Sequence, residues 1–396
     1  MTAEPPARSL SLPPPSRDED ARWMAAAVRL ARRHLGLTAP NPSVGAIVVA
    51  DGPDGRRVVG RGVTALGGRP HAEPQALRQA GDAARGATLY VTLEPCSHHG
   101  VTPPCVEAII AAGIVRVVAA VSDPDPRVAG RGFARLAAAG IAVTTGVAEA
   151  SAADGLCGHL ARVRLGRPHV LLKLAVSADR RIGRRDVANL AITGPAARAR
   201  AQLMRAETDA VAVGIGTAEI DDPALTVRLP GLAAASPVRV VFDAAARLAP
   251  RSRLAQTARE IRVIDLVAAG ADPDRCAALA ALGVEILPVA RGADGRLDLA
   301  AALTALAAGG ITSVLVEGGA EIAAALARRD LIDAVALFES DTVVGPDGLA
   351  LPAILAAALA ADGGSFDVAG REIWGPDRLT LFHRRAVPTP SRSERS

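Results

Sequence analysis

The chain has 396 residues, with 45 Lys and Arg against 41 Asp and Glu and a formal net charge of +4. This length predicts two domains, because a single hydrophobic core stops growing at roughly 250–300 residues. The small cationic excess suits small anionic ligands, whereas two Trp, one Tyr and five Phe, without a long run of like charge, argue against a nucleic-acid-binding surface. The sequence shows neither a signal peptide nor an apolar stretch long enough for a membrane span, so we expect a cytoplasmic protein.

The N-terminal part of the chain alternates between helix and strand patterns. Residues 1–16 are rich in Pro and Ser and are expected to be disordered, with Ser16 as a candidate N-cap. We expect helices at Arg17–Leu35, Ala72–Ala84, Cys105–Ala112 and Arg131–Ala139. We expect strands at Val44–Val49, Val58–Val63, Thr88–Leu93, Val115–Val121 and Ile141–Thr145. Such alternation predicts an α/β sheet, which we assign to a first domain at residues 17–150.

The same alternation continues in a second predicted domain, at residues 168–386, before a tail at 387–396 that is expected to be disordered. The expected strands are His169–Val176, Ala210–Val213, Val238–Phe242, Arg262–Asp265, Val284–Pro288, Ser313–Val316, Ala334–Phe338 and Arg378–His383. The expected helices are Ala196–Arg205, Asp298–Ala307 and Glu321–Ala327. This pattern predicts a second α/β sheet.

One histidine and two cysteines form the first candidate site. His71, Cys96 and Cys105 offer one nitrogen and two thiolates, a set that suits Zn²⁺ and leaves a fourth coordination position for water. Glu73 follows His71 by two residues, where its carboxylate can transfer protons beside the metal. Cys105 comes after two prolines at an expected helix N-terminus, which favours a thiolate. The alternative is a surface histidine with two buried thiols, but H-A-E followed by P-C after a strand favours the metal.

This order of residues resembles the zinc-dependent cytidine deaminase fold. The longer segment T-L-E-P-C-S-H-H-G-V-T-P-P-C, at Thr92–Cys105, resembles the bacterial bifunctional riboflavin-biosynthesis family, in which a pyrimidine deaminase is joined to a reductase. The resemblance implies that the histidine and the two cysteines hold one zinc ion and that Glu73 is the catalytic proton carrier.

Two further positions near this motif carry expectations from the family. Asn41, in P-N-P-S-V-G, resembles the residue that contacts the pyrimidine, although a turn residue between prolines is the alternative. The family generally has a basic residue where this chain has Val101. Arg69 and His98 are candidates to supply that charge.

Three stretches of the second domain resemble the reductase half of the same family and imply a fold like that of dihydrofolate reductase. They are L-K-L-A around Lys173, D-D-P-A-L-T-V-R at Asp221–Arg228 and V-L-V-E-G-G-A-E at Val314–Glu321. Lys173 is the only lysine of the chain, and a compact amine with an adjustable pKa is not replaceable by arginine. The alternative is that this single lysine is present by chance and has no function. Gly-Gly before a helix lets the backbone approach a pyrophosphate, with a tight turn as the alternative.

The resemblance implies NADPH as the second cofactor and assigns residues to both ligands. The implied substrate-binding residues of this half are Lys173, Asn189, Arg205, Leu225, Arg228 and Glu317. The implied cofactor-binding residues are Ala175, Ala191, Thr217, Asp221, Gly319, Ala320, Glu321, Ile322, Ala323, Ala324 and Ala325.

We therefore expect a bifunctional enzyme that acts on small phosphoribosylated pyrimidines. Zinc-dependent hydrolysis removes an amino group from the ring, and NADPH then reduces the ribosyl group to ribityl. The chain departs from the family at Arg180, Asn189 and Ala191, so a deaminase with a weakened reductase half is the alternative. A nucleic-acid-editing deaminase is a further alternative, which the low aromatic content disfavours. A homo-oligomer is a family expectation, and neither nucleic acid nor membrane is expected as a partner.

Overall fold

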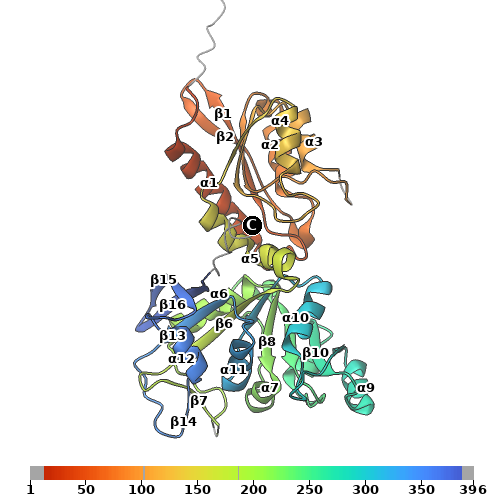
Figure 1. The fold of residues 1–396 in the computed structure, drawn as a ribbon, viewed down its shortest axis with the longest axis vertical. Helices are drawn as coiled ribbons and strands as arrows, with labels where there is room; N and C mark the ends of the chain where they lie inside the picture. Colours follow the sequence, from red (N-terminus) through yellow and green to blue (C-terminus); the bar gives the residue numbers. More distant parts are fainter. Residues whose placement is uncertain (1–12, 101–102, 186, 386–396) are drawn as a thin grey trace, which may run out of the picture. The chain divides into compact units, whose positions relative to one another are not determined.

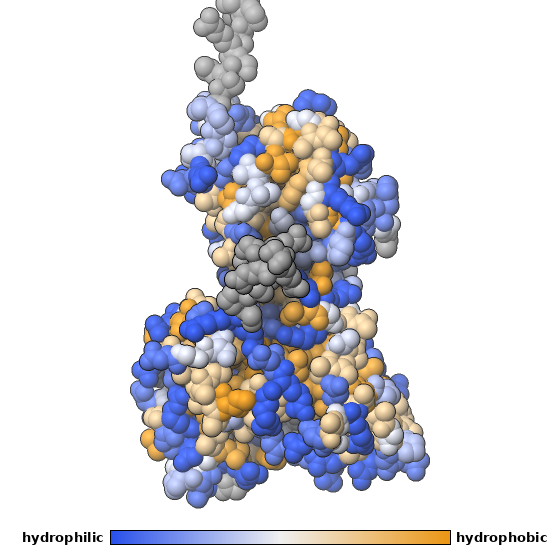
Figure 2. All heavy atoms as spheres, viewed as in Figure 1, coloured by the Kyte–Doolittle hydropathy of each residue, from blue (hydrophilic) through white to orange (hydrophobic). Residues whose placement is uncertain are grey.

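The computed structural model describes residues 13–100, 103–185 and 187–385, and the chain divides into two compact units, Met1–Leu165 and Gly166–Ser396 (Figure 1). Each unit contains a sheet flanked by helices, which confirms the predicted α/β class. Most of the two expected disordered tails and Val101 lie outside the described residues. Among the residues that are described, no helix is both long and apolar enough to cross a membrane. The visible face of each unit mixes hydrophilic and apolar side chains (Figure 2).

The first unit is built on a five-stranded sheet in the order β2-β1-β3-β4-β5. Its strands are β1 (Gly45–Gly52), β2 (Gly55–Val63), β3 (Thr88–Leu93), β4 (Arg116–Val121) and β5 (Ala142–Thr145). β1 pairs antiparallel with β2 and β3, whereas β3, β4 and β5 run parallel. Because parallel strands end at the same edge of a sheet, the segments that follow β3 and β4 lie close together there.

Helices cover both faces of this sheet (Figure 1). On one side lie α1 (Arg17–Ala31) and α5 (Glu149–Leu165), and on the other α2 (Ala72–Ala80), α3 (Cys105–Ala111) and α4 (Arg131–Ala138). Helix α2 packs very closely on β2 at two glycines. A Cβ atom on Gly60 would lie 2.1 Å from the carbonyl oxygen of Ala76, and one on Gly62 would lie 2.1 Å from that of Ala72. Only glycine therefore allows α2 its position on the sheet.

The ends of two predicted helices are corrected by the structure. Helix α1 begins as predicted, because Ser16 and Glu19 form a capping box, so the chain is already ordered before residue 17. It ends at Ala31 and continues as a 3₁₀ turn at Arg32–His34, short of the predicted Leu35. Helix α2 ends at Ala80 instead of Ala84, because Gly81 adopts a φ of +54° and a 3₁₀ turn at Gly81–Ala84 follows.

The second unit is built on a nine-stranded sheet in the order β11-β10-β9-β8-β12-β6-β13-β16-β15. The strands from β11 to β13 in this order run parallel, and β16 and β15 add an antiparallel edge. Their bounds are β6 His169–Val176, β8 Ala210–Gly214, β9 Val238–Phe242, β10 Val263–Ala268, β11 Glu285–Val289, β12 Ser313–Val316, β13 Ala334–Glu339, β15 Phe366–Trp374 and β16 Asp377–Arg384. The chain order reverses beside β8, where β12 is inserted between β8 and β6, and ligands bind at such points in parallel sheets.

Two apolar cores separate the layers of this unit. One contains residues of α6 (Pro195–Ala206), α8 (Arg253–Gln256) and α9 (Pro273–Ala281), and the other residues of α10 (Leu299–Ala308), α11 (Ala320–Arg328) and α12 (Ala353–Ala358). All the strands of the large sheet except β15 were predicted from the sequence. The elements that were not predicted are the two-stranded sheet of β7 (Arg181–Arg184) and β14 (Gly348–Ala350), and helices α5, α7 (Ile215–Asp221), α8, α9 and α12.

Candidate active sites

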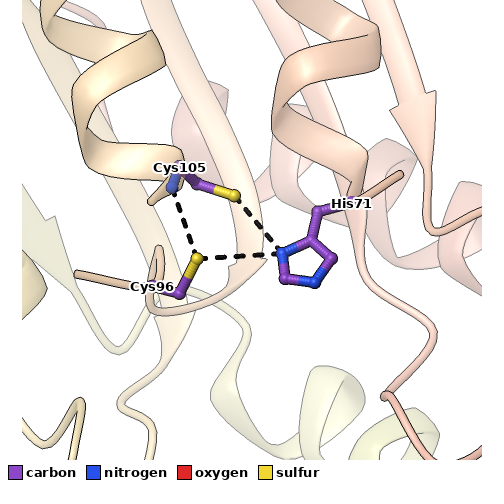
Figure 3. Close-up of side chains that lie close together, drawn as sticks. All are labelled: His71, Cys96 and Cys105. Carbon is purple, nitrogen blue, oxygen red and sulfur yellow. Dashed lines mark hydrogen bonds between the residues drawn. The ribbon is translucent and has the colours of Figure 1, made fainter. Parts of the chain in front are cut away.

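The predicted metal ligands of the first unit lie together (Figure 3). Nδ1 of His71 is 3.8 Å from Sγ of Cys96 and 3.4 Å from Sγ of Cys105, and the three ligand atoms lie within 4.8 Å of one another. The backbone N–H of Cys105 donates to the sulfur of Cys96 at 3.3 Å. One imidazole nitrogen and two sulfurs at this spacing fit tetrahedral zinc with one position left open.

Three separate segments bring these ligands together. His71 is the residue before α2, Cys96 follows the end of β3, and Cys105 is the first residue of α3 after Pro104. The close packing of α2 on Gly60 and Gly62 fixes the first of these segments against the sheet. The predicted helix N-terminus at Cys105 is confirmed.

Glu73 lies in the first turn of α2 and is 4% exposed. Burial, followed by the charge of Cys96, raises the pKa of Glu73 to about 7. Hydrogen bonding with Cys105 lowers the pKa of Cys96 to about 4, and the same pairing raises the pKa of Cys105. One sulfur is therefore a ready thiolate, and the carboxyl group beside it can both accept and return a proton near neutral pH.

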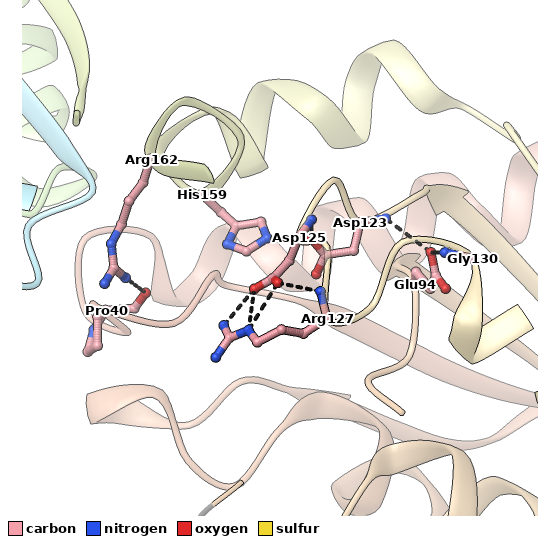
Figure 4. A network of polar contacts seen from close by, with 8 residues as sticks. All are labelled: Pro40, Glu94, Asp123, Asp125, Arg127, Gly130, His159 and Arg162. Atoms are coloured by element: carbon pink, nitrogen blue, oxygen red, sulfur yellow. Dashed lines mark hydrogen bonds and ion pairs between the residues drawn. The ribbon is translucent and has the colours of Figure 1, made fainter. Parts of the chain in front are cut away.

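A second carboxylate, Glu94, organises the loop beside this site (Figure 4). Glu94 follows β3 directly, is 3% exposed, and accepts hydrogen bonds from the backbone N–H groups of Asp123, Gly130 and Gly132 at 3.2, 3.1 and 3.0 Å. This contact joins the segment that carries Cys96 to the loop after β4. Glu94 is part of the T-L-E-P-C motif, but the sequence alone assigned no role to it.

The loop after β4 contains two further buried carboxylates. Asp123 accepts from the backbone of Asp125 at 2.9 Å and lies 3.0 Å from Nε2 of His159 on α5. Asp125 binds the guanidinium of Arg127, which lowers the pKa of Asp125 to about 2. Each carboxylate is therefore held in place by partners of its own.

Asn41 and Arg69 lie on the segments that precede His71. The Asn41 side chain donates to the carbonyl oxygen of Gly68 at 2.9 Å, so it fixes the turn just before the metal ligand. Gly68 adopts a φ of +88°. The Arg69 guanidinium would be 3.8 Å from a Cβ on Gly100, which places it beside the loop between the two cysteines.

In the second unit, Lys173, Arg205 and Glu317 form a buried charged cluster. Val316, the last residue of β12, pairs with Leu172 of β6, so Glu317, which follows β12, and Lys173 are neighbours. Burial lowers the pKa of Lys173, and Glu317 opposes this shift. Arg205 on α6 binds both oxygens of Glu317 and the carbonyl oxygen of Thr226 at 2.9 Å.

Two more predicted substrate residues, Leu225 and Arg228, lie on the segment after α7 that contains Thr226. Leu225 is 2% exposed and adopts a φ of +52°, and Arg228 is exposed, with its backbone N–H held by Gln202 at 2.8 Å. Burial and the charges of Arg205 and Arg253 lower the pKa of Arg228. An anion beside Arg228 would relieve this repulsion between cations.

A cavity of about 470 Å³ lies at the carboxyl ends of β8 and β9 and at the start of α11. Seven of the predicted cofactor residues and Asn189 line it. The seven are Thr217, Asp221, Gly319, Ala320, Glu321, Ile322 and Ala325. Its position is the point of reversed strand order where a nucleotide cofactor is expected.

Four predicted cofactor residues do not line this cavity: Ala175, Ala191, Ala323 and Ala324. Ala323 is fully buried and packs in the core beneath α11, so its side chain is turned away from the cavity. Asn189, predicted to bind substrate, also lines the cavity and forms two hydrogen bonds with Asp221. Its backbone N–H donates to Oδ1 of Asp221 at 2.7 Å, and its side-chain amide donates to the carbonyl oxygen at 3.0 Å.

Comparisons with known proteins assign each of the two units to a protein family. Residues 17–121 match the cytidine and deoxycytidylate deaminase zinc-binding region, and residues 168–352 match the RibD C-terminal domain. Together with the two sites, these matches define a zinc-dependent deaminase joined to an NADPH-dependent reductase.

The riboflavin biosynthesis protein RibD of Escherichia coli (strain K12) is 38% identical over 370 residues, which cover 91% of this chain and 98% of that protein. RibD of Bacillus amyloliquefaciens is 40% identical over 82% of this chain and 85% of that protein. The chain belongs to the RibD family of bifunctional riboflavin biosynthesis enzymes.

Solved structures agree with this membership. Acinetobacter baumannii RibD, form 1, matches with a TM-score of 0.80 at 34% identity, over 94% of this chain and 100% of that one. The Thermotoga maritima diaminohydroxyphosphoribosylaminopyrimidine deaminase/5-amino-6-(5-phosphoribosylamino)uracil reductase matches with a TM-score of 0.78 at 32% identity, over 93% and 99% of the two chains.

Proposed function

We propose that the chain catalyses two consecutive steps of riboflavin biosynthesis at the two sites described above. The first unit hydrolyses the 2-amino group of 2,5-diamino-6-(5-phosphoribosylamino)pyrimidin-4(3H)-one, with water consumed and ammonia released. The second unit reduces the ribosyl group of the resulting 5-amino-6-(5-phosphoribosylamino)uracil to ribityl. The observation that carries the proposal is the cluster of His71, Cys96 and Cys105 with buried Glu73 two residues after the first ligand.

Glu73 is the proton carrier of the proposed deamination. His71, Cys96 and Cys105 would hold zinc, which would supply a Lewis acid that makes water nucleophilic near neutral pH. Glu73 accepts the proton that the water gives up and delivers it to the departing amino group, so that the residue ends in its starting state. A carboxyl group with a pKa near 7 suits both steps.

Lys173 and Glu317 are the central polar groups of the proposed reduction. NADPH held by the residues that line the cavity would supply the hydride. Glu317, held by Arg205, offers a fixed acceptor to the ribosyl hydroxyl groups, and Lys173 offers a donor beside it. Arg228 is exposed and close enough to Arg205 and Glu317 for their charges to act on its pKa, and it suits the 5-phosphate because a guanidinium matches phosphate geometry.

We also propose that the protein works in the cytoplasm, on small molecules and as a homo-oligomer. Two of the four cysteines, Cys96 and Cys105, belong to the predicted metal site, a use of cysteine that suits a reducing compartment. The near balance of charge and the few aromatic residues support small-molecule substrates over nucleic acid.

Paired assays on the purified chain test the proposal. We expect about one zinc per chain, ammonia release from the diamino substrate, and NADPH oxidation with the deaminated intermediate. Glu73→Gln should keep zinc and lose deamination by about 10²-fold or more. Unchanged ammonia release in this variant contradicts the role of Glu73. Absence of NADPH oxidation in the wild type would instead favour a deaminase with a weakened reductase half.

A further inference from the structure

The cavity of the second unit has two ends with different surroundings. Asn189 and Asp221 bind each other at one end, and Gly319 lies two residues after Glu317 of the charged cluster. This end is therefore the one next to the substrate residues. At the other end the lining residues come from the segment after β9, from the segment before α10 and from the residue after α11, among them Ala244, Arg296 and Arg329.

The length of α11 separates these ends. Gly319 precedes α11, and Arg329 is the first residue after it. At 1.5 Å per residue, the two are about 15 Å apart along the helix axis. Phe242 of β9 lies two strands away from β12, which adds roughly 10 Å across the sheet. An extended dinucleotide with its reacting ring beside Glu317 thus has its adenosine at the Arg296 and Arg329 end.

Asp294 contacts both residues at this end, Arg329 through its guanidinium and Arg296 through its backbone only. Asp294 accepts from Nη2 of Arg329 at 2.7 Å and from the backbone N–H of Arg296 at 3.1 Å. The Arg296 side chain is exposed and makes no hydrogen bond or ion pair within the part of the chain that the structure describes. Because two guanidinium groups and one carboxylate lie there, this end of the cavity has a net positive charge.

We propose that Arg296 and Arg329 bind the 2′-phosphate on the adenosine ribose of the cofactor and thereby select NADPH over NADH. The inference rests on the proposed reductase function. The pyrophosphate of the cofactor suits another place, the start of α11, because Gly319, Ala320 and Glu321 line the cavity there and a helix N-terminus favours an anion. The remaining anion that distinguishes the two cofactors is the 2′-phosphate, and two guanidinium groups suit it in charge and geometry.

Binding of adenosine fragments to the full chain tests this assignment without the reaction. Adenosine 2′,5′-bisphosphate and 5′-AMP differ only in the 2′-phosphate, and calorimetry gives the dissociation constant of each. We expect the wild type to prefer the bisphosphate by about tenfold or more, because a charge-assisted hydrogen bond contributes at least this factor. Arg296→Ala combined with Arg329→Ala should remove the preference, and Arg296→Glu alone should reverse it.

Arg328→Ala is the matched control, because Arg328 is exposed, adjacent to Arg329 and does not line the cavity. It should keep the preference of the wild type. Ammonia release by the first unit confirms that each variant chain is intact. A preference that survives in the double variant overturns the inference, whatever the rate of reduction. A wild type that binds the fragments selectively but does not oxidise NADPH overturns the proposed reduction and leaves the inference supported.

Discussion

The guanidinium of Arg205 donates to both carboxylate oxygens of Glu317, from Nε to Oε1 at 2.5 Å and from Nη2 to Oε2 at 3.0 Å. Burial opposes the charge of Glu317, but Arg205 and then Lys173 lower its pKa, so the carboxylate is ionised. Arg205 was predicted to contact substrate. In the structure its guanidinium is occupied by Glu317 and Thr226, which leaves Arg228 as the better-placed cation for a phosphate.

Glu317→Gln should disable the reductase while sparing the deaminase. The amide keeps the shape of the side chain but removes the charge that balances Arg205 and Lys173. We expect at least a tenfold loss of kcat/KM for reduction and a loss of about 1–3 kcal/mol in stability, because a buried cation loses its counter-charge. NADPH oxidation, ammonia release and thermal unfolding measure the three effects. Equal losses in both activities would indicate general misfolding.

Lys173→Arg should impair reduction alone. Lys173 lies in β6 next to Glu317, with its Nζ 5.8 Å from the centre of the Phe338 ring. A guanidinium is larger, always charged and planar, so it does not fit the place of a buried amine. We expect at least a tenfold lower kcat/KM for reduction, with ammonia release unchanged. Full reductase activity would mean that this lysine is incidental.

Glu94→Gln should weaken deamination without loss of zinc. The variant replaces an oxygen that accepts backbone N–H groups of the Asp123–Gly132 segment with a donor amide. We expect a higher KM for the diamino substrate and a loss of about 1–3 kcal/mol in stability. Metal analysis and steady-state kinetics separate this effect from metal loss. Glu107→Gln, an exposed change on α3, is the control.

Removal of zinc should abolish ammonia release and leave NADPH oxidation intact. The three ligands all belong to the first unit, and the cavity and the charged cluster belong to the second. Dialysis against a chelator, followed by both assays and by addition of zinc, checks this expectation. Loss of both activities on chelation contradicts the independence of the two sites.

Asp265→Asn should stabilise the protein at neutral and alkaline pH. Asp265 in β10 is fully buried, and neither carboxylate oxygen has a hydrogen-bond partner among the described residues. Burial, and then the charge of Asp243, raises the pKa of Asp265 to about 8. The folded chain therefore keeps a proton that the unfolded chain loses near pH 4. Stability should fall as the pH rises between these values, by at most about 1.4 kcal/mol per pH unit from this group.

Thermal unfolding from pH 4 to pH 9 measures this effect. The wild type and Asp265→Asn should unfold at similar temperatures near pH 4, and the variant should unfold at the higher temperature near pH 8. Asp362→Asn, an exposed carboxylate, should show no such divergence. Parallel pH curves for wild type and Asp265→Asn would show that Asp265 is ionised in the folded state.

The sequence predicted best what depends on local pattern. The bounds of β3, β6, β9 and β12 match the prediction to the residue, because buried parallel strands are short apolar runs between turns. The three predicted metal ligands, which the structure brings together, could be proposed because histidine and cysteine at that spacing are rare in combination. Ser16 was found because capping depends on neighbouring residues alone.

What the sequence did not reveal depends on contacts between distant segments. The largely exposed β15 pairs with β16 at a sheet edge, and charged residues and a glycine interrupt its apolar residues, so it lacks a continuous apolar run. Asn189 reaches Asp221, and Arg329 reaches Asp294, over more than thirty residues of chain each. Of the alanines predicted at the cofactor, Ala323 faces the core, because only some positions of one helix turn face a cavity.

The tight packing of α2 over Gly60 and Gly62 has a genetic consequence. Every single-base change in a glycine codon that alters the residue introduces a side chain with a Cβ atom. At either position that atom would lie 2.1 Å from a helix carbonyl oxygen, so the helix that follows His71 must shift. We therefore expect only synonymous substitutions to be tolerated in these two codons as long as deamination is under selection.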